Sequence, residues 1–111
     1  MKIDTQHTQN GVMLKLDGEL DANTALNVDK NLNSLIEAGS VNILVDCARL
    51  EYISSAGIGV FIAHLEDIDS KNGKIVFFGL NDAVSSVLEM LGIDQIINIC
   101  KGLDEAKELI G

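Results

Sequence analysis

The chain has 111 residues and a formal net charge of -9 at pH 7, which suits one domain and disfavours binding to nucleic acid or to an anionic membrane. Hydrophobic residues make up 47% of the chain and aromatic residues only 4%, so an aliphatic core is expected, as in sheets covered by helices. The longest apolar stretch, residues 58–65, is too short to cross a bilayer, and the polar N-terminus indicates no signal peptide. We therefore expect a cytoplasmic protein.

The first third of the sequence predicts a β-hairpin followed by a helix. Residues 2–8 read as a weak strand, and residues 12–16 alternate apolar with polar side chains as in a half-buried strand. Asn10-Gly11 between them is a frequent hairpin turn. Asp21 or Asn23 can cap the helix, because each carries a short side-chain acceptor. The expected inward face of this helix consists of Val28, Leu32, Leu35 and Ile36.

The middle of the chain predicts a buried strand that leads to a second helix. Residues 43–45 form a continuous apolar run, typical of a central strand covered on both faces. The strand is expected to end at Asp46 and to be followed by a loop over residues 47–53. Apolar residues at helical spacing between 58 and 68 then predict the second helix.

The last third predicts two more strands and two more helices. Residues 75–78 form another buried strand, and Asn81 or Asp82 can cap the helix that follows. Residues 96–99 read as a short strand and residues 103–110 as a terminal helix. The inward residues of the third helix are expected to be Val84, Val87, Leu88 and Leu91.

These elements give the order β-β-α-β-α-β-α-β-α in a single α/β domain over residues 1–111. The opening hairpin is antiparallel, whereas strands joined by helices pair in parallel, so a mixed β-sheet packed with helices is expected. Sites in such sheets gather beyond the carboxyl ends of the strands, which is where residues 46–59 are expected to lie.

Small residues crowd the start of the second helix, in the run from Tyr52 to Gly59. A helix N-terminus carries unpaired N–H groups and partial positive charge, so it can hold a bound or covalent phosphate. Ser54 is placed to cap the helix, and Ser55 would begin it with an exposed hydroxyl. Two serines before a helix are also commonly nothing more than caps, and this reading stays open on the pattern alone.

Two separated motifs resemble those of the STAS domain family, which includes bacterial anti-sigma factor antagonists. The run from Leu44 to Val60 resembles the family signature, in which a buried strand leads to Asp-Ser-Ser/Thr-Gly and a helix. The run Gly18-Glu19-Leu20-Asp21, followed by Thr24-Ala25, resembles its second landmark. The order of elements agrees over essentially the whole chain, so the resemblance implies a single STAS-like domain.

The resemblance implies a phosphorylation switch. In the family, the anti-sigma factor is itself a serine kinase, and it phosphorylates the serine that corresponds to Ser55. Phosphorylation releases the antagonist from the anti-sigma factor, and this controls how much sigma factor is available. A phosphatase removes the phosphate and restores binding. This sequence has Ser54 where the family has Asp, and Ala56 where it has Ser or Thr. The partner-binding residues implied are Asp21, Asn23, Ser54, Ser55, Ala56, Gly57, Ile58 and Gly59.

Three other functions are each suggested by some feature of the sequence. A receiver-like domain would use Asp46 as a phosphoaspartate, but the acidic pair that holds Mg²⁺ after the first strand of such domains is absent from the sequence. A STAS scaffold, or a module of a signalling complex or transporter, would bind constitutively without phosphorylation, and the loss of the family Asp at Ser54 keeps this reading open. An enzyme is the weakest option, because His7 and His64 stand in no catalytic or metal-binding spacing; no cofactor and no metal are expected, and Cys47 and Cys100 are expected to be free thiols.

Overall fold

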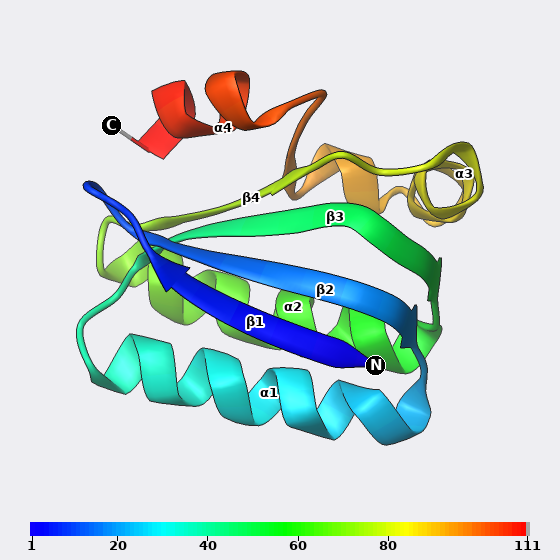
Figure 1. Cartoon of the computed structure of the whole chain (residues 1–111), viewed down its shortest axis with the longest axis horizontal. Helices are drawn as coiled ribbons and strands as arrows, with labels where there is room; N and C mark the ends of the chain where they lie inside the picture. The colour runs from blue at the N-terminus through cyan, green and yellow to red at the C-terminus, as the bar shows by residue number, and fades with distance from the viewer. Residues whose placement is uncertain (111) are drawn as a thin grey trace.

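The computed structural model describes residues 1–110 as one five-stranded sheet with helices on both faces (Figure 1). The strands are β1 (Lys2–His7), β2 (Val12–Leu20), β3 (Asn42–Ile53), β4 (Lys74–Phe78) and β5 (Asn98–Cys100). The helices are α1 (Ala22–Glu37), α2 (Ser55–Ser70), α3 (Asp82–Met90), the 3₁₀ turn η1 (Ile93–Gln95) and α4 (Leu103–Ile110). The predicted mixed α/β fold is therefore confirmed.

The sheet has the order β1-β2-β3-β4-β5. β1 pairs with β2 antiparallel through the predicted hairpin, in which the Thr8 N–H donates to the Gly11 carbonyl at 2.8 Å. All other neighbours are parallel, as expected for strands joined by helices. The carboxyl ends of β2 and β3 consequently meet at one edge of the domain, the right-hand side of Figure 1.

The two faces of the sheet carry separate cores, because successive side chains of a strand point to opposite sides. Leu14, Val45 and Phe77 belong to the larger core, which α1, α2 and α3 cover. The neighbouring residues Met13, Leu44, Val76 and Phe78 belong to a smaller core closed by Ala106 and Ile110 of α4. Figure 1 shows α4 on one side of the sheet and α1 on the other.

The predicted loop over residues 47–53 is wrong, because β3 continues without interruption to Ile53. Its second half pairs with β2 out of simple register, with irregularities between Lys15 and Asp17 and between Gly18 and Glu19. These bulges twist the strand, so the buried positions Cys47, Leu50 and Ile53 recur every third residue. A search for alternation with a period of two therefore misses this half of the strand.

Two predictions near the C-terminus are also wrong in detail. The strand expected at residues 96–99 begins only at Asn98, because residues 96 and 97 follow directly on the 3₁₀ turn η1 (Ile93–Gln95). Leu91 is the C-cap of α3 and is 55% exposed, whereas Val84 and Leu88 are buried as expected. The cap closes the helix before Leu91 can turn inward. Among residues 1–110, no helix combines the length and the apolar character that a membrane span requires.

The two thiols should differ in reactivity. Cys47 is buried in the larger core, and burial raises its pKa to about 12, while Cys100 is half-buried with its pKa raised by burial and by Glu105. A thiol with a raised pKa stays protonated and unreactive at neutral pH. We expect iodoacetamide to label Cys100 slowly in the native protein and Cys47 only in denaturant, as measured by mass spectrometry of peptides. Equal labelling of both in the native state would contradict the burial of Cys47.

Candidate functional site

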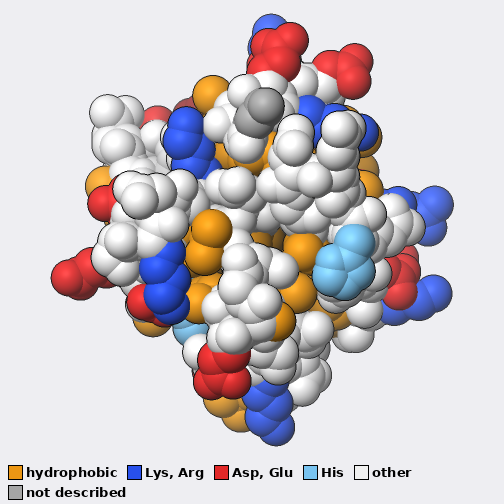
Figure 2. Space-filling model, turned by 90° about the vertical axis from the view of Figure 1, so that its left-hand side faces the viewer, with side chains coloured by type: hydrophobic (Ala, Val, Ile, Leu, Met, Phe, Trp, Pro, Cys, Tyr) orange, Lys and Arg blue, Asp and Glu red, His pale blue; other side chains and the backbone are white. Residues whose placement is uncertain are grey.

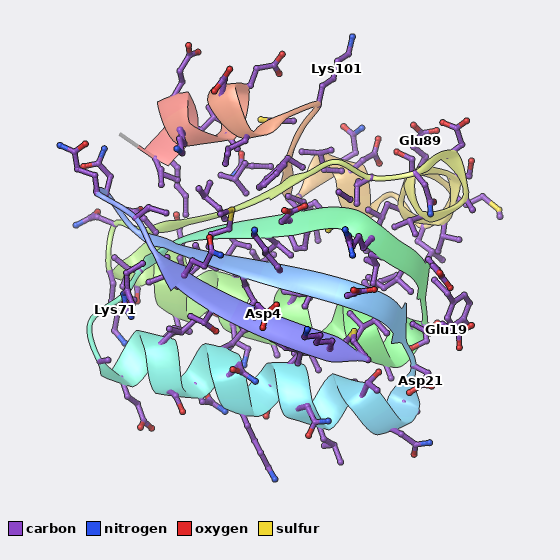
Figure 3. All side chains as sticks on the ribbon, viewed as in Figure 1. Asp4, Glu19, Asp21, Lys71, Glu89 and Lys101 are labelled. Atoms are coloured by element: carbon purple, nitrogen blue, oxygen red, sulfur yellow. The ribbon has the colours of Figure 1, made fainter. Side chains whose placement is uncertain are left out.

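Helices α1 and α2 begin side by side at the carboxyl ends of two paired strands. Leu20 of β2 stands opposite Ile53 of β3, and each helix cap is the next residue along. The Ser54 N–H donates to the Leu20 carbonyl at 2.8 Å, which ties the two strand ends together. Asp21 and Ser54 are therefore neighbours, and the first turns of both helices present N–H groups at the same end of the domain. Figure 3 shows Asp21 with Glu19 at this end.

Asp21, not Asn23, caps α1. Its carboxylate accepts hydrogen bonds from the N–H groups of Asn23 at 3.0 Å and Thr24 at 2.9 Å, while the Thr24 hydroxyl accepts from the Asp21 N–H at 2.9 Å. This is a reciprocal capping box. The Thr24 N–H is the main cause of a lowered pKa of Asp21. The carboxylate is thus charged at neutral pH, and the stability that it adds is present above the unfolded pKa and lost as pH falls through the lowered folded pKa.

Ser54 and Ser55 have different environments. The Ser54 hydroxyl is half-buried and accepts a hydrogen bond from the Gly57 N–H at 3.2 Å, so the predicted cap is confirmed. Ser55 is the first residue of α2 and is exposed. The hydroxyl that caps the helix is thus turned onto the backbone, and the next hydroxyl is open to solvent.

Gly57 and Ile58 are buried at the start of α2, so the role predicted for them in partner binding stays a prediction. A Cβ on Gly57 would lie 2.5 Å from Leu20 Cγ, and Ile58 is only 5% exposed. Gly57 is therefore required by the close approach of α2 to the end of β2. A Cβ on Gly59 would meet no atom within 4 Å. The surface that remains consists of Asp21, Asn23, Ser55, Ala56 and Gly59, with Ser54 half-buried behind it.

Asp46 does not lie at this site. It sits within β3, between Lys15 of β2 and Phe78 of β4, and its carboxylate accepts a hydrogen bond from the Ala48 N–H at 3.0 Å. The prediction that the strand ends at Asp46 is wrong, because the pairing with β2 continues to Ile53. A phosphoaspartate site at the end of this strand thus has no support in the geometry.

Two exposed hydrophobic residues near the helix starts were not predicted. Tyr52 is 50% exposed and pairs with Glu19, one step before the Leu20–Ile53 pair. Leu26, in the second turn of α1, is 65% exposed. Leu26 does not belong to the buried face of the helix, which consists of Ala25, Val28, Leu32 and Ile36. A leucine outside the helical spacing of the buried face could have indicated an exposed apolar residue from the sequence alone.

His64 of α2 contacts α1 at a point farther from the helix starts. It is 8% exposed, and its Nε2 lies 2.8 Å from Oδ1 of Asp29. His64 has no catalytic spacing in the sequence, and its hydrogen-bonding distance to the half-exposed Asp29 indicates a structural contact. Together with the Ser54–Leu20 bond, it holds the two helices along their length.

The glycines of α2 provide a matched pair of variants. Gly57→Val should destabilise the fold by about 1–3 kcal/mol, because the new side chain collides with Leu20. Gly59→Val, with open space around it, should change stability by no more than about 0.5 kcal/mol. Urea denaturation followed by circular dichroism measures both, and equal costs at the two positions would contradict the role assigned to Gly57.

Ser54 and Ser55 provide a second matched pair of variants. Ser54→Ala should cost about 0.5–2 kcal/mol, the range for loss of an N-cap, while Ser55→Ala should stay within about 0.5 kcal/mol. The same denaturation experiment tests this. A larger cost at Ser55 than at Ser54 would show that the cap has been assigned to the wrong serine.

Comparisons with known proteins agree with this geometry. The profile of the STAS domain matches residues 2–106. An anti-sigma-B factor antagonist from Listeria monocytogenes is 30% identical over 82 residues, 74% of this chain and 72% of the relative. Its counterpart from Staphylococcus aureus is 22% identical over 104 residues, 94% of this chain and 96% of the relative.

Solved structures share the fold. A crystal structure of a Thermotoga maritima protein, proposed to be an anti-sigma factor antagonist, superposes with a TM-score of 0.91 at 25% identity and covers 97% of this chain and 93% of the other. The phosphorylated form of SpoIIAA, a Bacillus cell fate determinant, superposes with a TM-score of 0.75 at 18% identity over 99% of this chain and 100% of the other. The matched region contains both capped helix starts and the whole sheet, and the chain belongs to the STAS domain family, in its anti-sigma factor antagonist type.

Proposed function

We propose that this protein is an anti-sigma factor antagonist controlled by phosphorylation of Ser55. In its unmodified form it binds an anti-sigma factor of the serine-kinase type, and phosphorylation by that kinase releases it. The observation that carries the proposal is the division of roles at the start of α2, where Ser54 caps the helix and Ser55 is exposed. The antagonist names of the Listeria and Staphylococcus relatives, and the SpoIIAA structure in a phosphorylated form, support it.

The proposed binding surface is mostly polar, and its small residues let another chain approach closely. Asp21 and Asn23 come from the start of α1, and Ser55, Ala56 and Gly59 from the start of α2. The space above Gly59 is open. A partner that carries basic side chains would complement the charged Asp21 carboxylate and the net charge of -9.

A phosphate on Ser55 would change the surface and leave the fold intact. It adds a charge of about -1.5 to -2 and three strong acceptor oxygens. The N-terminus of α2 tolerates this charge, because its partial positive charge favours anions. The neighbouring Asp21 carboxylate is already negative, so a docked partner would face added bulk and a local negative charge that rises from -1 to about -2.5 to -3. Release of the partner follows, and a phosphatase acting on phosphoserine would restore binding.

The substitution of the family Asp by Ser54 is compatible with this role. Asp and Ser are both favourable N-caps, so the hydrogen bond to the Gly57 N–H is kept while one carboxylate beside Ser55 is lost. The change alters the charge that a kinase would meet and leaves the backbone of the helix start in place. It is also the one observation that favours the second candidate, a STAS scaffold that binds its partner without being phosphorylated.

Phosphate transfer tests the proposal directly. The protein is incubated with ATP, Mg²⁺ and an anti-sigma factor kinase from the same organism, and the modified residue is mapped by mass spectrometry. We expect phosphate on Ser55 in the unaltered protein and in Ser54→Ala, and none in Ser55→Ala. Ser55→Asp should bind the kinase more weakly than Ser55→Ala in a titration, although one carboxylate carries less charge than a phosphate.

Two outcomes would change the assignment. Phosphate on Ser54, or undiminished phosphate on Ser55→Ala, would refute Ser55 as the acceptor. Tight binding to the kinase with no phosphate transferred would favour the constitutive scaffold.

A further inference from the structure

The sheet has a second feature that the proposed function does not use, at the edge opposite β1. Strand β5 is the last strand of the order β1-β2-β3-β4-β5, and in residues 1–110 it pairs only with β4. Its outer backbone groups therefore face away from the sheet. An unpaired edge is a template on which another extended chain can add by main-chain hydrogen bonds.

Two open grooves lie beside this edge. One groove, of about 530 Å³, lies between β5 and the C-terminal half of α2 and is lined by Leu65, Ile96 and Asn98 among others. The other, of about 440 Å³, lies between β5, α3 and α4 and is lined by Ile97, Ile99 and Leu109 among others. The helices α2 and α3 cover the same face of the sheet. Every second side chain of a strand added beside β5 would therefore point toward the grooves, because successive residues of a strand point to opposite faces.

Apolar side chains gather around the edge without joining either core. Ile96 is 57%, Ile99 36% and Leu109 40% exposed. These three large aliphatic residues line the two grooves beside one edge strand, so they form a cluster and are not scattered over the surface. Such patches mark sites at which another chain binds.

The charges of the rim decide what kind of chain fits. Glu66 and Asp69 line the first groove, and Glu89 and Asp94 line the second. Lys74 lies at the first groove, but its ammonium group already donates to the Leu109 carbonyl at 3.1 Å. A second copy of this chain would bring the same acidic rim and a net charge of -9, so self-pairing is opposed by repulsion.

We propose that the β5 edge binds an extended, basic segment of a partner protein as a sixth strand. Main-chain hydrogen bonds to β5 would hold the segment, its aliphatic side chains would fill the grooves beside Ile96 and Ile99, and its lysines or arginines would face the four carboxylates. The short length of β5, three residues, keeps the edge from pairing indiscriminately.

This surface is separate from the start of α2. Glu66 lies eleven residues after Ser55 on the same helix, roughly 16 Å along its axis at 1.5 Å per residue. Figure 3 shows Glu89 and Lys101 in the upper part of the view, and Glu19 and Asp21 lower down on the right. Figure 2 looks at the end of the domain opposite the helix starts, where acidic and basic side chains are interspersed around exposed hydrophobic atoms. The protein can consequently hold a partner at β5 while the Ser55 surface is occupied.

The test uses a synthetic peptide of eight residues that alternates lysine with isoleucine or threonine, added to the ¹⁵N-labelled protein. We expect amide shifts centred on residues 96–101 and on the lining of the two grooves. Two N-methylated versions of the peptide, blocked on alternate amides, should differ, because only one set of amides faces β5. Ile99→Lys should weaken binding by about tenfold or more. Met90→Lys, an identical charge change at an 81% exposed residue outside both grooves, should leave binding unchanged.

If Ile99→Lys loses the native amide spectrum, Ile96→Lys replaces it, since Ile96 is the more exposed of the two. Shifts centred on Asp21 and Ser55, equal binding of both N-methylated peptides, or an equal loss with Met90→Lys would overturn the proposal. Sedimentation that shows dimers disrupted by Ile99→Lys would assign the edge to a second copy instead. No kinase takes part, so this test fails or succeeds independently of the Ser55 switch.

Discussion

The hydrogen bond from the Ser54 N–H to the Leu20 carbonyl is the contact on which the arrangement of the two helix starts depends. It joins the last residue of β2 to the cap of α2. The helix can come this close because residue 57 is a glycine; a Cβ there would lie only 2.5 Å from Leu20 Cγ. Both helices then begin on neighbouring strands and run alongside each other to the His64–Asp29 contact. Two capped N-termini are thereby held at one edge of the domain, with Asp21 and Ser55 on a shared surface.

Capping explains how the site separates structure from regulation. Asp21 and Ser54 use their side chains to satisfy backbone N–H groups, so their polar atoms stabilise the helices that carry them. Ser55 is free of this task and can take a charged group without removing a cap. In the proposed switch, the helix dipole would favour a phosphate on Ser55 and the adjacent carboxylate would oppose it, so the fold would tolerate a modification to which a partner would respond.

The acidic character of the chain acts at both surfaces in the same direction. At the helix starts it would favour a basic partner, and a further negative charge there would repel acidic groups. At β5 the carboxylates of α2, α3 and η1 lie beside exposed aliphatic side chains, so they would favour the proposed extended basic segment over a second copy. The sheet links the two surfaces, since β3 and β4 carry the core that supports α2 on one side and lead to β5 on the other.

The sequence by itself determined the order of the elements, the hairpin at Asn10-Gly11 and the cap at Ser54, because these depend on local patterns that neighbouring residues decide. It did not determine the second half of β3, where bulged pairing with β2 replaces the alternation that marks a strand. Nor did it separate Gly57 from Gly59, which look alike in the chain but differ in whether Leu20 stands above them. The inward direction of Ile58, the exposure of Leu91 and the open edge at β5 likewise follow from how elements far apart in the sequence pack. Only the tertiary structure decides such features, because they depend on distances between residues that the chain does not place next to one another.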